Sequence, residues 1–254
     1  MLTTVPMPQI SYAAAADNAT PTMLGSLYSQ NRAFFDSSFY NDRIAMITAQ
    51  NKEFYVTKIT DEIWERIRGK SYKDNCTLPR EDLRYIHVLH KDLNGDTHEG
   101  EMICNVYIAA DVLEILKVLY DVNYPIEKIR LVDEYNADDE ASMRDNNSSS
   151  FNFRTISYST KISKHGLGLA VDINTLYNPY IKLVDGQVHV EPANALPYVD
   201  RSKSYPYKID ESDLCYQLFT AHGFEWGGSW SRAKDYQHFE VPDDVISVLY
   251  PDNK

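Results

Sequence analysis

The alternation of apolar and polar positions is clearest between residues 163 and 174. Apolar residues occupy every second position there and alternate with small or polar ones: Leu167, Leu169, Val171 and Ile173 against Gly168, Ala170, Asp172 and Asn174. A period of two predicts a strand with one buried face, whose other face is nearly bare as far as Asp172. His165 precedes Asp172 by an odd number of positions, so we expect it on the turn leading into this strand, where glycines relax the backbone.

A second alternation, between residues 238 and 241, predicts a partner strand. His238 and Glu240 share one face, and Phe239 and Val241 share the other. Asp235 stands three residues before His238. The two segments together supply imidazoles and carboxylates, the side chains from which catalytic metal sites are built.

Longer elements follow from helical spacing, cap residues and turn signals. Helices are predicted over 60–67, 106–122 and 210–222, a hairpin joins 84–89 to 100–105 through Asn94-Gly95, and a core strand spans 129–133. The intervening residues 133–150 read as a long acidic loop, which either is simply solvated or borders the substrate groove, and 198–207 are a candidate lid. These elements predict an α+β fold, an antiparallel sheet with helices packed on one side and the metal site on the sheet.

The hairpin carries two other motifs that we interpret as structural. Asp92-x-Asn94-x-Asp96 has the spacing of a calcium loop, but Thr97 and Ile103 stand where that loop needs Gly and Glu. The histidines of the hairpin have a spacing that does not suit one strand face, so we expect surface or edge residues rather than ligands: His87, His90 and His98.

Composition limits the protein's organisation and partners. Residues 1–25 are small, polar and Pro-bearing and predict a flexible tail, and 26–254 predict one domain, with an N-terminal wrap and hairpin over 26–100 and a catalytic core over 101–254. The net charge of −12 argues against a nucleic-acid partner, and no apolar run is long enough to span a bilayer. We expect a monomer.

The N-terminal sequence and the cysteines bear on the cellular compartment of the protein. No Lys or Arg precedes Arg32, so a leader peptide is not visible, and a removed leader fits as well as a cytoplasmic protein. Buried free thiols are the expectation for Cys76, Cys104 and Cys215, with a Cys76–Cys104 bridge as the alternative in an oxidising compartment.

His165, Asp172 and His238 form the predicted metal site. Two neutral imidazoles and one carboxylate suit zinc, and three protein ligands leave a fourth position for water. Zinc in such a set lowers the pKa of bound water from ~15.7 toward ~7. Asp235 is close enough in sequence to accept the proton of that water, as a general base.

These motifs resemble a known family. Ser163-x-His165-x-x-Gly168-x-Ala170-x-Asp172, then Trp226-Gly-Gly-x-Trp230 and Asp235-x-x-His238, are similar to the zinc peptidases of the D-alanyl-D-alanine carboxypeptidase and L-alanyl-D-glutamate endopeptidase superfamily. The resemblance covers roughly residues 130–241. It implies a Hedgehog/DD-peptidase-like fold, zinc, and a peptidoglycan peptide substrate met outside the cell or at the cell wall. It also makes Arg154 the match for the family's oxyanion-stabilising arginine.

The resemblance is closest to the endopeptidase branch, which includes phage endolysins, because that branch carries Asp-x-x-His after a Trp-Gly-Gly-x-Trp loop. A D-alanyl-D-alanine carboxypeptidase is the alternative, and it would need a cation for the terminal carboxylate, for which Lys161, Lys164 and Arg232 are available. A non-catalytic, metal-stabilised cell-wall-binding module is the alternative of another class.

Four further residues are expected near the site, each with a structural alternative. Ser163 supports the first ligand or only shapes the turn, and Glu240 orients His238 or only finishes the strand. Trp226 and Trp230 floor the substrate groove or only brace the zinc-bearing strands. His222 is interpreted as the end of a helix rather than as a ligand.

Overall fold

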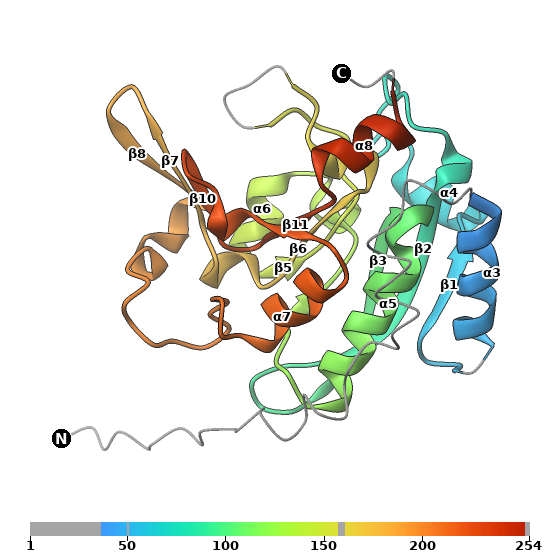
Figure 1. Ribbon diagram of the computed structural model, residues 1–254, viewed down its shortest axis with the longest axis horizontal. Coiled ribbons are helices and arrows are strands. Elements are labelled where there is room, and N and C mark those ends of the chain that lie inside the picture. Colours follow the sequence, from blue (N-terminus) through green and yellow to red (C-terminus); the bar gives the residue numbers. More distant parts are fainter. Residues whose placement is uncertain (1–36, 50, 157–160, 252–254) are drawn as a thin grey trace.

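The computed structural model describes residues 37–49, 51–156 and 161–251 (Figure 1). Its helices and antiparallel sheets confirm the α+β class. The strands form three three-stranded antiparallel sheets and one two-stranded parallel sheet, where the sequence predicted a single sheet. Among the described residues, no helix is long and apolar enough to cross a membrane.

The first half of the described chain builds a regular layer. It consists of α3 (Ser37–Thr48), β1 (Tyr55–Lys58), α4 (Asp61–Ile67), η2 (Arg80–Asp82), β2 (Leu83–Lys91), β3 (Thr97–Asn105) and α5 (Val106–Asp121). The sheet has the order β1-β2-β3, and α5 lies across it beside α3 (Figure 1). The predicted hairpin and the helices at 60–67 and 106–122 are confirmed.

Side-chain caps and a tight turn explain why these elements begin where they do. The Thr60 hydroxyl accepts a hydrogen bond from Ile63 N and caps α4, and Asn105 caps α5 in the same way. Asp92 Oδ1 accepts from the main-chain N–H groups of Asn94 and Asp96, which closes the hairpin turn. The acidic residues of this turn therefore serve the turn itself.

The prediction for the hairpin histidines is wrong for His90. His98 is exposed, but His90 is 5% exposed, and its Nδ1 lies 2.7 Å from the carbonyl oxygen of Ile126. Because a carbonyl only accepts, His90 Nδ1 carries the proton. His90 is thus a satisfied core residue.

Residues 128–148 differ from both predictions made for them. They form β4 (Lys128–Ile129), η3 (Val132–Tyr135), α6 (Asp139–Arg144) and β5 (Asn147–Ser148). The predicted core strand therefore ends at Ile129, and the predicted loop is mostly helical. Asp138 caps α6 through Ala141 N, so the acidic residues are those of a helix start.

The second half consists of short elements. They are η4 (Lys164–Leu167), β6 (Ala170–Asp172), η5 (Thr175–Tyr177), β7 (Tyr180–Val184), β8 (Gln187–Glu191), η6 (Ala193–Tyr198), α7 (Leu214–Ala221), β9 (Glu225–Trp226), η7 (Gly227–Ser229), β10 (Ala233–Asp235), β11 (His238–Glu240) and α8 (Asp243–Leu249). One sheet has the order β6-β11-β9 and another β10-β7-β8, whose β7–β8 hairpin projects from the body (Figure 1). The helix predicted over 210–222 begins only at Leu214, after the Asp213 cap.

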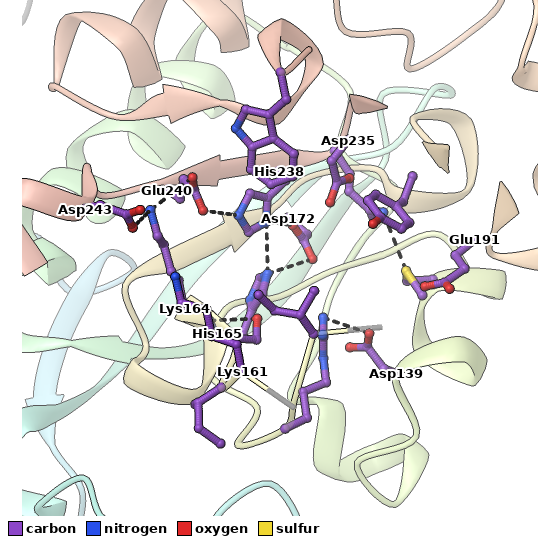
Figure 2. Close-up of a pocket in the computed structure, with 18 residues that line it drawn as sticks. Asp139, Lys161, Lys164, His165, Asp172, Glu191, Asp235, His238, Glu240 and Asp243 are labelled. Carbon is purple, nitrogen blue, oxygen red and sulfur yellow. Dashed lines mark hydrogen bonds and ion pairs between the residues drawn. The ribbon is translucent and has the colours of Figure 1, made fainter. Parts of the chain in front are cut away.

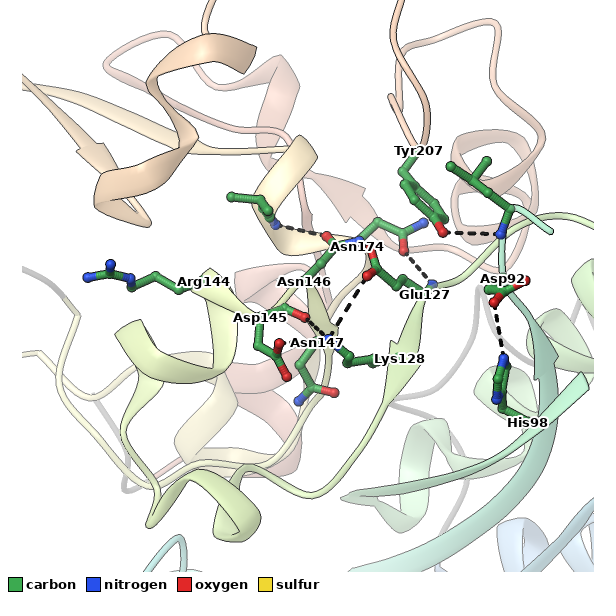
Figure 3. Close-up of polar contacts among 12 residues, drawn as sticks. Asp92, His98, Glu127, Lys128, Arg144, Asp145, Asn146, Asn147, Asn174 and Tyr207 are labelled. Atoms are coloured by element: carbon green, nitrogen blue, oxygen red, sulfur yellow. Dashed lines mark hydrogen bonds and ion pairs between the residues drawn. The ribbon is translucent and has the colours of Figure 1, made fainter. Parts of the chain in front are cut away.

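Buried asparagines hold these short elements together (Figure 3). Asn147 exchanges two hydrogen bonds with the main chain of Arg130, and Asn174 bonds the main chain at Pro125 and Glu127. Asn178 accepts from Ile209 N and donates to Tyr207 O. Because each amide both donates and accepts, it replaces the main-chain pairing that strands of two or three residues cannot supply.

The loop 198–207 does not lie over the candidate site as the predicted lid would. Arg201 donates to the carbonyl oxygens of Tyr177 and Ile209, and its guanidinium lies 4.2 Å from the ring centroid of Tyr236. No described residue of the loop lines the cavity that contains the histidines. The three cysteines are free thiols, as expected.

Candidate metal centre and substrate cavity

The first candidate ligand, His165, stands on a 3-10 turn. Ser163 caps this turn by accepting from His165 N at 3.3 Å, and Gly168 ends it at φ 63°. A Cβ at Gly168 would lie 2.8 Å from the main-chain N of Asn105, whose N–H donates to Gly168 O. The predicted turn position of His165 is therefore correct, but the strand is shorter than predicted. At Gly168, the face expected to be bare is filled by the main chain of Cys104 and Asn105, where β3 ends.

The other two candidate ligands face each other on paired strands. Asp172 on β6 is the direct antiparallel partner of His238 on β11. The main chain of Asp172 is also paired with Ser149, which fixes β6 from its other side. His238 and Glu240 share one face of β11, as predicted, while Phe239 and Val241 are fully buried behind them.

The three side chains converge on one point (Figure 2). His165 Nε2 lies 3.1 Å from His238 Nδ1 and 3.1 Å from an oxygen of Asp172, and His238 Nδ1 lies 2.9 Å from the other oxygen. Ligand atoms about 2.0–2.1 Å from a tetrahedral zinc ion are roughly 3.3 Å apart. The observed spacing fits such an ion after a small expansion.

The outward nitrogens of both imidazoles determine which atoms face inward. His165 Nδ1 lies 2.6 Å from Ser150 O, and His238 Nε2 lies 3.0 Å from Glu240 Oε2. Both partners are acceptors, so the outward nitrogens carry the protons and, with neutral rings, two lone pairs and a carboxylate face one another. Such a set needs a positive charge at its centre.

The pKa shifts of Asp172 and His238 indicate the same need for a positive charge between the candidate ligands. Burial acts to raise the pKa of Asp172, but the two histidines outweigh it and hold this pKa far below its usual range. Burial acts to lower the pKa of His238, but hydrogen bonds to Asp172 and Glu240 outweigh it and raise the pKa to about 10. The three candidate ligands thus hold a proton between them, and a metal ion bound there would take the place of the His238 proton.

Glu240 is held in turn by Lys164. The ammonium of Lys164 lies 3.0 Å from Glu240 Oε1 and 2.7 Å from Asp243 Oδ1, and it donates to Val241 O. In Figure 2 this group lies to one side of the histidines and Asp235 to the other. Lys164 is therefore engaged in orienting the site.

Asp235 lines the same cavity from the end of β10. Its Oδ1 is buried and has no hydrogen-bond partner within the part of the chain that is described. Burial, first, and the charge of Asp172 raise its pKa to about 7. A hydrogen bond from Gln237 acts in the opposite direction. A carboxylate that binds a proton near neutrality and has one oxygen without a partner is suited to accept a proton from a ligand.

Gly227 allows the Trp-Gly-Gly loop to pack against this carboxylate. A Cβ at Gly227 would lie 2.7 Å from both Cβ and O of Asp235 and 3.3 Å from Cβ of His238. The glycine is needed for close approach, because its neighbours are main-chain and β-carbon atoms that cannot give way. This loop therefore fixes the position of the Asp235–His238 segment.

Arg154 also lines the cavity and is paired with an acid. Its guanidinium lies 2.8 Å from Asp139 on α6. Burial acts to lower the pKa of Arg154, but the surrounding carboxylates, Asp139 foremost, raise it. Residues 133–150 were expected to border the substrate groove. Asp139 does line the cavity, although it lies on a helix rather than a loop.

The two tryptophans have different roles. Trp226 is 6% exposed, and its indole N–H donates to Tyr236 O at 3.0 Å, so it braces the strands. Trp230 lines the cavity, with its ring centroid 5.4 Å from that of His238. Only Trp230 is in a position to contact a substrate.

His222 ends α7, as predicted, and also forms an ion pair that was not foreseen. Its Nδ1 lies 3.1 Å from Asp111 Oδ1, and these two residues with Glu114 resemble a second metal-binding group. Arg43, however, bonds to Asp111 at 2.7 Å and to Glu114. The arginine already supplies the positive charge, so this cluster joins α3, α5 and α7.

The cavity has a volume of about 230 Å³ and contains further residues that the sequence did not single out. They are Asp139, Met143, Ile156, Ile162, Tyr180, Glu191, Gln237 and Asp243. Tyr180 and Glu191 stand opposite each other at the base of the β7–β8 hairpin. The Asp185-Gly186 turn could have predicted that hairpin, but nothing in the sequence indicates that its base meets β10.

A model of the D-alanyl-D-alanine carboxypeptidase family matches residues 157–241. This segment is similar to that peptidase family. The resemblance is confirmed here, over about a third of the chain, and the peptidase-family segment contains His165, Asp172, Asp235 and His238. No curated protein and no solved structure matches the chain. Arg154, Asp139 and Ser150 come before the family segment and are connected to it by the contacts described above.

Proposed function

We propose that the protein is a zinc peptidase that hydrolyses peptide bonds in bacterial peptidoglycan stem peptides. The observation that carries the proposal is the convergence of His165, Asp172 and His238 in one cavity with an acid at its wall, Asp235, whose Oδ1 has no partner among the described residues. The match to a peptidase family supports the reaction class. We also propose that the protein acts outside the cell or at the cell wall, where this substrate lies, and that it is a monomer.

His165, Asp172 and His238 would hold the metal ion. Zinc bound there supplies a Lewis acid for the scissile carbonyl and lowers the pKa of water. Asp235 accepts the proton of the attacking water and passes it to the leaving amine, which its pKa near neutrality suits. Ser150 O and Glu240 keep the two imidazoles in orientation.

Arg154 stabilises negative charge that develops on the carbonyl oxygen. A fixed guanidinium facing a buried cavity is worth more than one in water, because the surroundings need not reorganise when the charge appears. Asp139 holds Arg154 at 2.8 Å and so limits its movement. Trp230 covers the His238 side of the cavity and would contact the bound peptide.

An L-alanyl-D-glutamate endopeptidase is the preferred activity. A carboxypeptidase needs a cation for the terminal carboxylate, and two of the three described cations lining the cavity, Arg154 and Lys164, are already paired with acids. Lys161, the third, is exposed and is the cation that a carboxypeptidase would use. Arg232 is exposed and does not line the cavity. A D-alanyl-D-alanine carboxypeptidase remains the second proposal because the matching family carries that description.

A metal-stabilised binding module is less well supported. Such a module has no use for a buried carboxylate oxygen without a partner, whose desolvation costs about 1–3 kcal/mol. Asp235 is therefore better explained by a reaction than by binding alone.

Mass spectrometry of purified peptidoglycan fragments would test the proposal, with chelator-treated protein and with zinc restored. A new L-alanine carboxyl end on the glycan side would establish the endopeptidase. Loss of a terminal D-alanine alone would establish the carboxypeptidase and overturn the preferred bond. Zinc binding without cleavage of any fragment would favour the binding module.

A further inference from the structure

Gln237 is a buried amide whose two ends have unequal partners. It lies between β10 and β11, is 2% exposed and lines the cavity. Its Nε2 lies 3.5 Å from the sulfur of Met143, and its Oε1 is buried without a hydrogen-bond partner among the residues for which the structure gives positions. Burying an unpaired amide oxygen costs about 1–3 kcal/mol, so an acceptor in this position calls for a donor.

The chemistry of Met143 explains why the oxygen is the end left without a partner. A thioether sulfur is a weak acceptor and donates nothing, so only the NH₂ end of Gln237 makes a favourable contact with it. Reversing the amide would place two acceptors against each other and leave a donor unpaired. The arrangement with Oε1 left over is therefore the favoured one.

Gln237 is also rigidly placed beside the reacting groups. Its carbonyl oxygen accepts from Ile173 N at 3.0 Å, and the next residue is the candidate ligand His238. Asp235, two residues earlier, also has a buried Oδ1 without a partner in the described part of the chain, and a hydrogen bond from the Gln237 side chain acts to lower the pKa of Asp235. The amide nitrogen of Gln237 therefore faces acceptors, and only its oxygen is left needing a donor that the cavity receives.

We infer that Gln237 Oε1 accepts a hydrogen bond from a main-chain amide N–H of the substrate peptide next to the scissile bond. This inference rests on the proposed peptidase function and adds a substrate-positioning residue to it. A peptide substrate supplies N–H donors at regular intervals along its main chain. The bond would fix the register of the peptide in the cavity, so that one particular carbonyl reaches the metal centre and Arg154.

The first test is Gln237→Met, which keeps the length of the side chain and removes its acceptor. KM for a stem peptide should rise about tenfold, the worth of one hydrogen bond, with zinc content unchanged. Gln217→Met is the matched control, because Gln217 is exposed on α7 and its amide bonds only Ser212 O among the hydrogen bonds described. An unchanged KM in Gln237→Met would overturn the inference.

A series of peptides, each methylated at one amide nitrogen, separates substrate binding from a structural role. Methylation at one position should cost the unsubstituted protein about tenfold in kcat/KM and cost Gln237→Met little, because the variant has no bond to lose. Equal losses in both proteins at every position would mean that Oε1 bonds water or protein, and would overturn the inference.

Folding and the proposed function are controlled separately. If thermal melting shows that Gln237→Met does not fold, Gln237→Asn replaces it, since a side chain shorter by one methylene withdraws the oxygen but keeps the amide. The same outcomes are then expected. If the unsubstituted protein cleaves no peptide, the proposed function fails and the inference fails with it. If it cleaves with a KM that neither variant alters, the inference alone fails.

Discussion

The two halves of the molecule are stabilised in different ways. The layer of β1, β2, β3 and α5 has strands of up to nine residues and a helix of sixteen, with apolar side chains packed between them. The sheet that bears the candidate metal site has two strands of three residues and one of two, and buried asparagines join its surroundings. Regular pairing supports the first region, and specific side-chain hydrogen bonds support the second.

This difference separates stability from function. Apolar contacts are non-directional, so losing one weakens the fold without moving a particular atom. Hydrogen bonds from an amide fix distance and angle, so losing one shifts the main chain that it holds. Damage to the first region should lower stability alone, whereas damage to the second should also reach the metal site. Four predictions test this contrast.

The largest effect is expected from Asp235→Asn. The amide cannot accept a proton, so kcat should fall 10²- to 10⁴-fold while zinc stoichiometry and thermal stability stay close to those of the parent protein. Single-turnover cleavage and metal analysis measure the two quantities. Asp185→Asn is the control, because Asp185 is exposed at a hairpin turn that Asn also suits. A rate within threefold of the parent would exclude Asp235 as the base.

Leu113→Ala tests the apolar region. Leu113 is fully buried on α5, so the cavity left by its side chain should lower the free energy of unfolding by about 3–4 kcal/mol. Urea denaturation gives this value. The affinity for zinc at 25 °C should not change in the folded fraction. A tenfold loss of zinc affinity in Leu113→Ala would contradict the separation of the two regions.

Asn147→Ala tests the asparagine-braced region. The change leaves the N–H and C=O of Arg130 without their partner, which should cost about 2–3 kcal/mol of stability. Asn147 lies two residues before Ser149, the main-chain partner of Asp172, so the affinity for zinc should also fall several-fold. Competition with a chromogenic chelator measures this affinity. Asn194→Ala, at an exposed side chain, should change neither quantity. Unaltered zinc affinity in Asn147→Ala would show that the brace is purely structural.

The smallest effect comes from pH in the apolar region. Burial lowers the pKa of His90 from its ordinary 6.5 to about 4. As pH falls, the unfolded chain takes up the proton first, so His90 contributes full stability above about pH 6.5 and loses it toward pH 4. Between pH 6.5 and 5 the loss should be about 2 kcal/mol. His90→Gln should show a loss smaller by that amount in urea denaturation at the two pH values, and identical losses in both proteins would refute the assignment.

The same contrast explains what the sequence could predict. The hairpin followed from Asn94-Gly95 between two apolar runs, and α5 from its apolar spacing, because local patterns and tertiary packing agree there. The strand before Asp172 was predicted too long, because the same alternation of residues forms a 3-10 turn ended by Gly168. Only the position of Asn105, far away in sequence, shows why that glycine is needed.

The candidate site was predicted in its ligands but not in its surroundings. The motif spacing indicated His165, Asp172, Asp235 and His238, and the structure brings them together in one cavity. The pairing of Arg154 with Asp139 and the position of Gln237 in the cavity wall were not predictable, because they depend on how α6 and the turn after β10 meet. Contacts of this kind join segments whose residue patterns carry no information about each other.

The boundaries of the peptidase-family segment cut through the environment of its own first histidine. The carbonyl that holds His165 belongs to Ser150, and the main chain against which Gly168 packs belongs to Asn105, both before residue 157. An excised piece covering 157–241 would keep every proposed metal ligand and lose the groups that aim one of them. Modularity in this protein therefore ends at the level of sequence recognition, and any exchange of its catalytic segment between proteins must carry α5 and the 147–154 segment along.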